Sequence, residues 1–100
     1  MWGSNAREAH PIFFHHVLKG IRNGAKLVVV DPRKTSSAQF GDLWLGLNVG
    51  SDIALSHTIA REIIVSGIHN RAFIENGTSD FASYQACVMD WTLERGEKVT

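Results

Sequence analysis

The apolar positions along the chain follow two different periods. From Pro11 onward they recur at helical spacing, which predicts an amphipathic helix that ends near Asn23, with a short turn over residues 5–9 in front of it. Residues 26–30 are a continuous run rich in β-branched side chains, as expected for a parallel strand covered on both faces. Residues 43–47 predict a second, shorter strand.

The second half of the chain is predicted to be helical. Ser51 or Asp52 begins a helix that Gly67 ends, because these residue types are favoured at the two kinds of helix terminus. We expect its large aliphatic residues to point mostly inward: Ile53, Leu55, Ile59, Ile63 and Ile64. Short helices follow over residues 69–77 and 80–91, and another after them. Helix, strand, strand and helix in this order predict an α/β fold with a parallel sheet.

The composition is that of a folded protein. The 100 residues are 44% hydrophobic, and ten basic residues balance ten acidic ones. Disorder is therefore excluded, and no overall positive field points to nucleic acid or to a membrane surface. No apolar run is long enough to span a bilayer. Both ends of the chain look cut, so we expect a fragment of something larger.

The single cysteine, Cys87, fits a reducing compartment. With no signal-peptide pattern at the N-terminus, this predicts a cytoplasmic location, although an upstream signal could export a longer parent. Cys87 lies in an apolar stretch and is predicted to be a small buried hydrophobe. The histidines lack the spacing that places two imidazoles on one helix face, and no nucleophile lies beside a base, so we expect neither a metal site nor catalytic residues.

Three polar stretches follow expected element ends and are the candidate sites. We name them the first corner (Gly3 to Asn5), the second corner (Asp31 to Arg33) and the third corner (Gly50 to Asp52). In open α/β sheets, ligands bind beyond the carboxyl ends of the strands, so these corners could meet at one ligand. In the first, a glycine allows close backbone approach and the following turn offers N–H groups to a phosphate. Alternatively it is an ordinary capped turn. Asn5 could cap it with Glu8 as capping-box partner, but Pro11 would then lie inside the helix, which favours a short turn over residues 5–9.

The second and third corners each deliver an acid. Asp31 stands at the end of a strand, where its two oxygens could accept both hydroxyls of a ribose, or it simply opens an Asp-Pro turn. Arg33 and Lys34 are plausible anion ligands beside it. Asp52 could accept both the ring N–H and the exocyclic amine of guanine, or act only as a helix cap.

Taken together, the segments "WGSNAREAHP", "VVVDPRKTSSAQFGD" and "LNVGSDIAL" resemble the cofactor-binding region of the molybdopterin oxidoreductase family, and within it formate dehydrogenase catalytic subunits. The resemblance runs from Trp2 to about Val99. It implies part of a Rossmann-like parallel-sheet dinucleotide-binding domain, with an α/β core over residues 2–67 and a helical extension over residues 68–100. Small departures are Gly41, where alanine is usual, and Ser37, where threonine is frequent.

The resemblance implies that the cofactor is molybdopterin guanine dinucleotide with molybdenum or tungsten. In the family the first corner lies against the phosphates, the acid of the second binds the guanosine ribose, and the acid of the third binds guanine. The cofactor-binding residues would be Gly3, Ser4, Asn5, Asp31, Arg33, Thr35, Gly50 and Asp52. The cysteine-rich iron–sulfur motif and the metal-ligating cysteine or selenocysteine would lie upstream in the parent.

The function predicted from this resemblance is the cofactor-binding piece of a formate dehydrogenase-like enzyme. Its partners would be the rest of the catalytic subunit and electron-transfer subunits, with no nucleic acid and no membrane insertion by this chain. The chain alone would be inactive. The alternatives are a nitrate reductase-like member of the family and a nucleotide-binding or interaction module without redox chemistry. An upstream reading frame with a cysteine cluster would favour an enzyme.

Overall fold

The computed structural model describes all 100 residues, which form two compact units, Met1–Val49 and Gly50–Thr100. The first unit contains two α-helices, a short 3₁₀ helix and two strands. Their bounds are α1 (Ala6–Ala9), α2 (Pro11–Arg22), β1 (Val28–Val30), η1 (Ala38–Phe40) and β2 (Leu43–Leu45). The predicted short turn followed by a helix from Pro11 is confirmed. Proline is accommodated there because the first helical N–H has no intrahelical acceptor.

The strands β1 and β2 pair in parallel, with Val28 opposite Leu43. On its other edge β1 receives the N-terminus, where Trp2 forms a parallel bridge to Val30 and the Met1 N–H donates to the Val28 carbonyl over 2.8 Å. The predicted parallel pairing is confirmed, and β1 lies between two chain segments.

Both strands are shorter than predicted. Before β1, the Leu27 N–H donates to the Asp42 side chain over 2.9 Å instead of to a strand carbonyl. The same carboxylate lies 2.8 Å from the Lys26 ammonium. A side chain thus takes over the ladder position, and the regular strand begins only at Val28.

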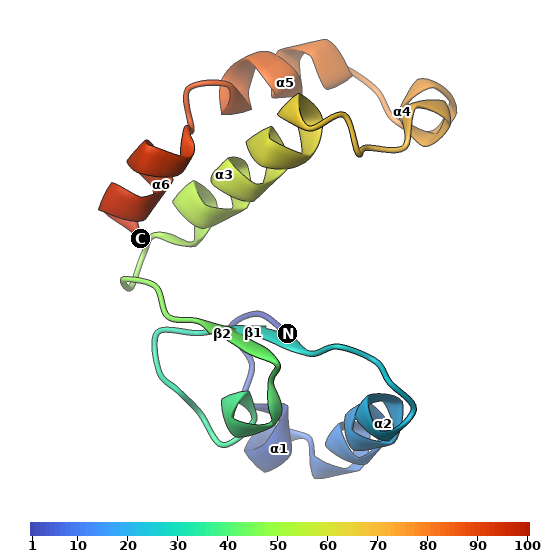
Figure 1. Ribbon diagram of the computed structural model, residues 1–100, viewed down its shortest axis with the longest axis vertical. Helices are drawn as coiled ribbons and strands as arrows, with labels where there is room; N and C mark the ends of the chain where they lie inside the picture. The colour runs from blue at the N-terminus through green and yellow to red at the C-terminus, as the bar shows by residue number, and fades with distance from the viewer. The chain divides into compact units, whose positions relative to one another are not determined.

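The core of the first unit lies between β1 and the helical segments. Leu27, Val29 and Ala38 form it, with Val17 and Ile21 of α2 packed against them. In Figure 1 both α1 and α2 lie on one side of the strand pair. Val29 is fully buried in this cluster, against which the predicted apolar stripe of α2 packs.

The second unit is entirely helical and confirms the predicted series of short helices. Its elements are α3 (Asp52–Val65), α4 (Arg71–Gly77), α5 (Phe81–Val88) and α6 (Leu93–Val99). Helices α5 and α6 both pack along α3 (Figure 1). No helix has the length and apolar character that crossing a membrane requires.

The face that α3 buries differs from the predicted one. Ile53, Ile59 and Ile63 are 67%, 38% and 39% exposed, and the buried residues are Ala54 and Thr58. Small side chains are buried because α6 approaches closely. A Cβ atom on Gly96 of α6 would lie 2.4 Å from Thr58 Oγ1.

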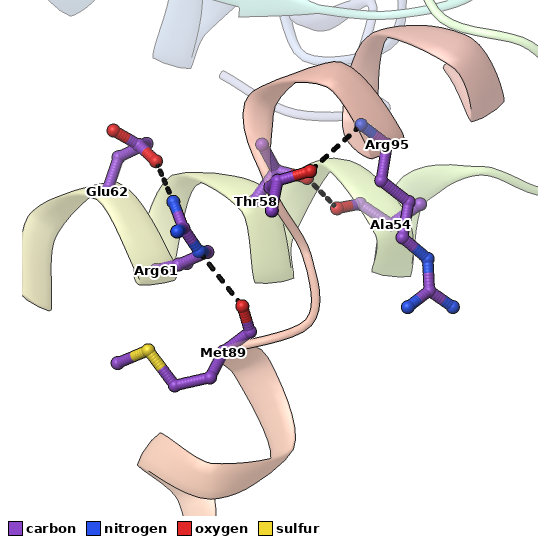
Figure 2. A network of polar contacts seen from close by, with 7 residues as sticks. Ala54, Thr58, Arg61, Glu62, Met89 and Arg95 are labelled. Atoms are coloured by element: carbon purple, nitrogen blue, oxygen red, sulfur yellow. Dashed lines mark hydrogen bonds and ion pairs between the residues drawn. The ribbon is translucent and has the colours of Figure 1, made fainter. Parts of the chain in front are cut away.

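Polar contacts hold α3 to the connection between α5 and α6, as Figure 2 shows. The Arg61 Nε–H donates to the Met89 carbonyl over 2.9 Å, and its guanidinium pairs with Glu62 at 2.5 Å. Within α3 the Thr58 hydroxyl donates to the Ala54 carbonyl over 2.8 Å, so the group next to Gly96 has its partner inside the helix.

We predict that Gly96→Ala destabilises the second unit, because the new methyl group must displace Thr58. Overpacking of this kind costs about 1–3 kcal/mol, more than the helix propensity that alanine brings. Urea unfolding monitored by circular dichroism measures the loss in unfolding free energy. Adding Thr58→Ala should restore part of that loss.

The matched control is Gly20→Ala in α2, where the new Cβ would meet only Ala25 Cβ, at 3.7 Å. This change should leave the free energy of unfolding equal or raise it by up to about 1 kcal/mol. Equal effects of the two substitutions would contradict the close packing of α3 on α6.

Candidate functional site

The first corner carries the chain from the sheet edge into α1. Gly3 has φ +57°, a left-handed conformation that glycine adopts without steric cost. Its N–H donates to the Val30 carbonyl over 2.8 Å, so the turn is attached directly to the end of β1. The first helix begins only three residues later, at Ala6.

Asn5 links the first corner to the loop after the second. Its side chain does not cap α1, so the capping interpretation is wrong. Instead its Oδ1 accepts from the Ser37 hydroxyl at 2.8 Å and the Ser37 N–H at 3.4 Å, and lies 3.1 Å from Ser36 Oγ. The Ser37 hydroxyl is fully buried and also accepts from the Arg7 N–H at 2.9 Å.

Glu8 was not among the predicted site residues. Its carboxylate accepts a hydrogen bond from the Ser36 hydroxyl at 2.6 Å. That bond, a second one with Asn5 and the positive charge of Arg33 lower the pKa of Glu8 below its usual range. The only sequence signal was the spacing of three residues from Asn5, which places both side chains on one side of a helical turn.

In the second corner Asp31 is buried at the carboxyl end of β1. Its Oδ1 accepts from the Arg33 N–H at 2.9 Å, which is the local turn expected of an Asp-Pro sequence. Its carbonyl accepts from the Trp44 indole N–H at 2.9 Å. The acid is thus held in a fixed orientation by the turn that it opens.

The two corners of the first unit share one cavity of about 190 Å³. Its lining residues are Asn5, Glu8, Arg33, Lys34 and Thr35. Lys34 is held beside it with its ammonium 5.6 Å from the centre of the Trp44 ring. Two cations, a hydroxyl and an amide, beside the single carboxylate of Glu8, are suited to binding an anion such as a phosphate.

The remaining predicted residues lie around this cavity or in the other unit. Gly3, Ser4 and Asp31 are not lining residues. The third corner belongs to the second unit: Gly50 has φ +91°, Ser51 is the N-cap residue of α3, and Asp52 is its first helical residue and exposed. Asp52 thus stands in the first turn, where a carboxylate is favoured by the helix dipole.

The cysteine and the histidines were also considered as site residues in the sequence. Cys87 is exposed, which corrects the prediction that it is buried. The neighbouring Val88 is fully buried instead, because consecutive helical residues point about 100° apart. His57 packs edgewise against Tyr84 and Trp91, with ring centres 6.3 and 5.9 Å away. No three His, Cys, Asp or Glu side chains gather where they could hold a metal ion.

Comparison with known protein families identifies the family of this chain. The family model described as molybdopterin oxidoreductase matches residues 1–87. The chain belongs to the molybdopterin oxidoreductase family. Membership implies a molybdopterin cofactor with molybdenum or tungsten, and it confirms the resemblance seen in the sequence.

Relatives within the molybdopterin oxidoreductases have several activities. Formate dehydrogenase H of Escherichia coli is 37% identical over the whole chain, and a nitrate reductase of Synechocystis is 42% identical over 84 residues, or 82% of the chain. The structure of acetylene hydratase from Pelobacter acetylenicus matches 88% of the chain with a TM-score of 0.84 and 31% identity. The chain spans only about 12–14% of the length of these relatives.

We predict that Ser36→Ala raises the pKa of Glu8 toward its usual range, because it removes the hydrogen bond that contributes most to the lowering. An NMR titration of the Glu8 side-chain carboxyl carbon measures it. With the pKa lowered in the folded state, the carboxylate stabilises the fold above its ordinary pKa, and this contribution is lost as the pH falls through the lowered value. If the pKa of Glu8 is unchanged in the Ser36→Ala variant, the hydrogen bond between Ser36 and Glu8 is contradicted.

Proposed function

We propose that this segment binds the guanosine diphosphate half of molybdopterin guanine dinucleotide within a formate dehydrogenase-like oxidoreductase. The observation that carries the proposal is the polar cavity shared by the first and second corners, with Arg33 and Lys34 at its wall. Its position beyond the carboxyl end of β1 is where open parallel sheets bind nucleotides.

The chemistry of the lining residues fits a diphosphate. Arg33 can donate two parallel hydrogen bonds to one phosphate, and Lys34 adds a positive charge without a fixed direction. The Thr35 hydroxyl and the backbone of Gly3 and Ser4 complete the set of groups assigned to the phosphates. Asn5 aligns the first corner with these residues through its bonds to the loop.

The two acids have separate roles in the proposal. Asp31 accepts from the ribose hydroxyls, which suits its fixed orientation at the end of β1. Asp52 accepts from the ring N–H and amine of guanine, and Gly50 supplies the left-handed turn that precedes it. The metal carried by the bound cofactor supplies the redox centre, and this segment only holds the nucleotide end.

The same proposal gives roles to the rest of this chain and to the rest of the catalytic subunit. We assign residues 2–67 to the α/β core of a Rossmann-like cofactor-binding domain and residues 68–100 to its helical extension. An iron–sulfur cluster and the metal ligand are assigned to other parts of the catalytic subunit, which would act in the cytoplasm with electron-transfer subunits. Relatives named as alpha subunits of F420-dependent formate dehydrogenases support such partners.

Formate is the proposed substrate because two formate dehydrogenases, 37% and 39% identical, align over 95% or more of the chain. Nitrate is the second candidate, favoured by the 42% identity to a nitrate reductase over a shorter stretch. The same cofactor-holding segment would serve either reaction.

Binding of GDP-mannose and ADP-mannose, two diphosphate diesters, tests the nucleotide roles. Asp31→Ala should weaken both about tenfold to a hundredfold, because the ribose is common to them. Asp52→Asn should weaken only the guanine compound, because the amide NH₂ would face a guanine donor. Isothermal titration calorimetry or NMR titration of the chain measures these affinities.

Asp31→Asn serves as the control for the turn, because its amide oxygen can still accept from the Arg33 N–H. Asp31→Asn should weaken binding less than Asp31→Ala does.

If the preference for guanine survives Asp52→Asn in a folded chain, Asp52 is a helix-terminal residue only. The base would then have to be recognised by other residues.

The chain by itself is predicted to be inactive in formate oxidation. It gathers no metal-binding group of side chains, and the metal ligand is assigned to other parts of the catalytic subunit. An assay with an artificial electron acceptor and supplied cofactor should give only background. Turnover above that background would contradict the assignment of the catalytic groups to the rest of the subunit.

A further inference from the structure

The cavity of the first unit contains a negative charge that phosphate binding alone does not require. Of its five lining residues, Arg33 and Lys34 are cationic and Glu8 is anionic. A site selected only for anion affinity would not place a carboxylate at the wall, because like charges repel. The carboxylate therefore calls for an explanation of its own.

The exposed Glu8 carboxylate has Ser36 and Asn5 as its side-chain neighbours. Ser36 Oγ lies 2.6 Å from the Glu8 carboxylate and 3.1 Å from Asn5 Oδ1. A hydroxyl has a single hydrogen, and the shorter contact to the charged acceptor is the stronger of the two. Asn5 keeps the Ser37 hydroxyl as donor at 2.8 Å, so the carboxylate and the amide each have a partner. A glutamate is ionised at neutral pH, and the lowered pKa of Glu8 extends this state to more acidic pH.

Charge distinguishes the proposed ligand from free nucleotides. A diphosphate esterified at both ends carries one negative charge on each phosphate. A nucleoside diphosphate such as GDP has a terminal phosphate whose second ionisation lies near pH 6, so at pH 7.5 it carries about one more negative charge. The two ligands share base, ribose and both phosphates, and they differ in the charge of the terminal phosphate.

We propose that Glu8 is a specificity-determining residue that makes this cavity prefer a diphosphate diester over nucleotides with a terminal phosphate. This inference rests on the proposed function. Arg33 and Lys34 supply attraction for both ligands, and Glu8 opposes the additional charge of the terminal phosphate. Its role is to reduce competition from free nucleoside diphosphates and triphosphates.

Affinities of the full chain for GDP and GDP-mannose at pH 7.5 and low salt test this proposal. The decisive variant is Glu8→Gln, which can still accept from Ser36 but has no charge. The ratio of GDP to GDP-mannose affinity should rise about threefold, the factor expected for one charge pair roughly 6 Å apart in a water-like dielectric. Added salt should reduce the difference.

Two controls separate charge from structure. Ser36→Ala removes the hydrogen bond but keeps the carboxylate, so the affinity ratio should stay at the wild-type value. Glu75→Gln removes the same charge from α4, which does not line the cavity, and should also leave the ratio unchanged. Circular dichroism of each variant confirms that it is folded.

The outcomes distinguish this inference from the proposed function. If Arg33→Ala weakens both ligands but Glu8→Gln leaves their ratio unchanged, or if Ser36→Ala raises the ratio equally, the charge preference is wrong. If the wild-type chain binds neither ligand, or Arg33→Ala changes neither affinity, the phosphate site itself is wrong and the inference fails with it. A rise confined to Glu8→Gln supports the role of the carboxylate.

Discussion

The side-chain oxygen of Asn5 is the contact on which the site of the first unit depends. It accepts hydrogen bonds from Ser37, 32 residues further along the chain, and so joins the turn before α1 to the loop before η1. Ser37 is fully buried, and a buried hydroxyl left without its acceptor costs about 1–3 kcal/mol. This cost favours the conformation in which the two segments stay together. Arg33, Lys34 and Thr35 lie just before this loop and face the same cavity.

The sheet contributes the other constraint. Because β1 pairs with β2 on one edge and with the N-terminal residues on the other, Gly3 and Asp31 both leave the sheet at its carboxyl end. Parallel pairing thus brings together two segments that are distant in sequence, and the Asn5 contact then orients them. The second unit is held differently, by close approach of α6 to α3 at Gly96 and Thr58.

Local signals in the sequence were sufficient for the elements but not for all side chains. Pro11, Gly67 and the β-branched run before Asp31 each act over a few residues, and the helices and parallel strands they predicted are present. The inward face of α3 could not be predicted from apolar periodicity, because the helix packs through Ala54 and Thr58 against a glycine of α6. Glu8 was missed for a similar reason: its partner Ser36 is 28 residues away. At Gly41 a Cβ would lie 3.2 Å from two backbone carbonyl oxygens, so an alanine in this chain would be tightly packed.

Nucleotide binding at the cavity of the first unit is tested most directly by NMR mapping of the backbone amides that shift when the chain binds GDP-mannose. Large shifts are expected at residues 5–8 and 33–36, where the first and second corners meet at the cavity. If the amide signals of these residues do not shift at saturating GDP-mannose, and signals elsewhere in the chain do, binding at this cavity is contradicted.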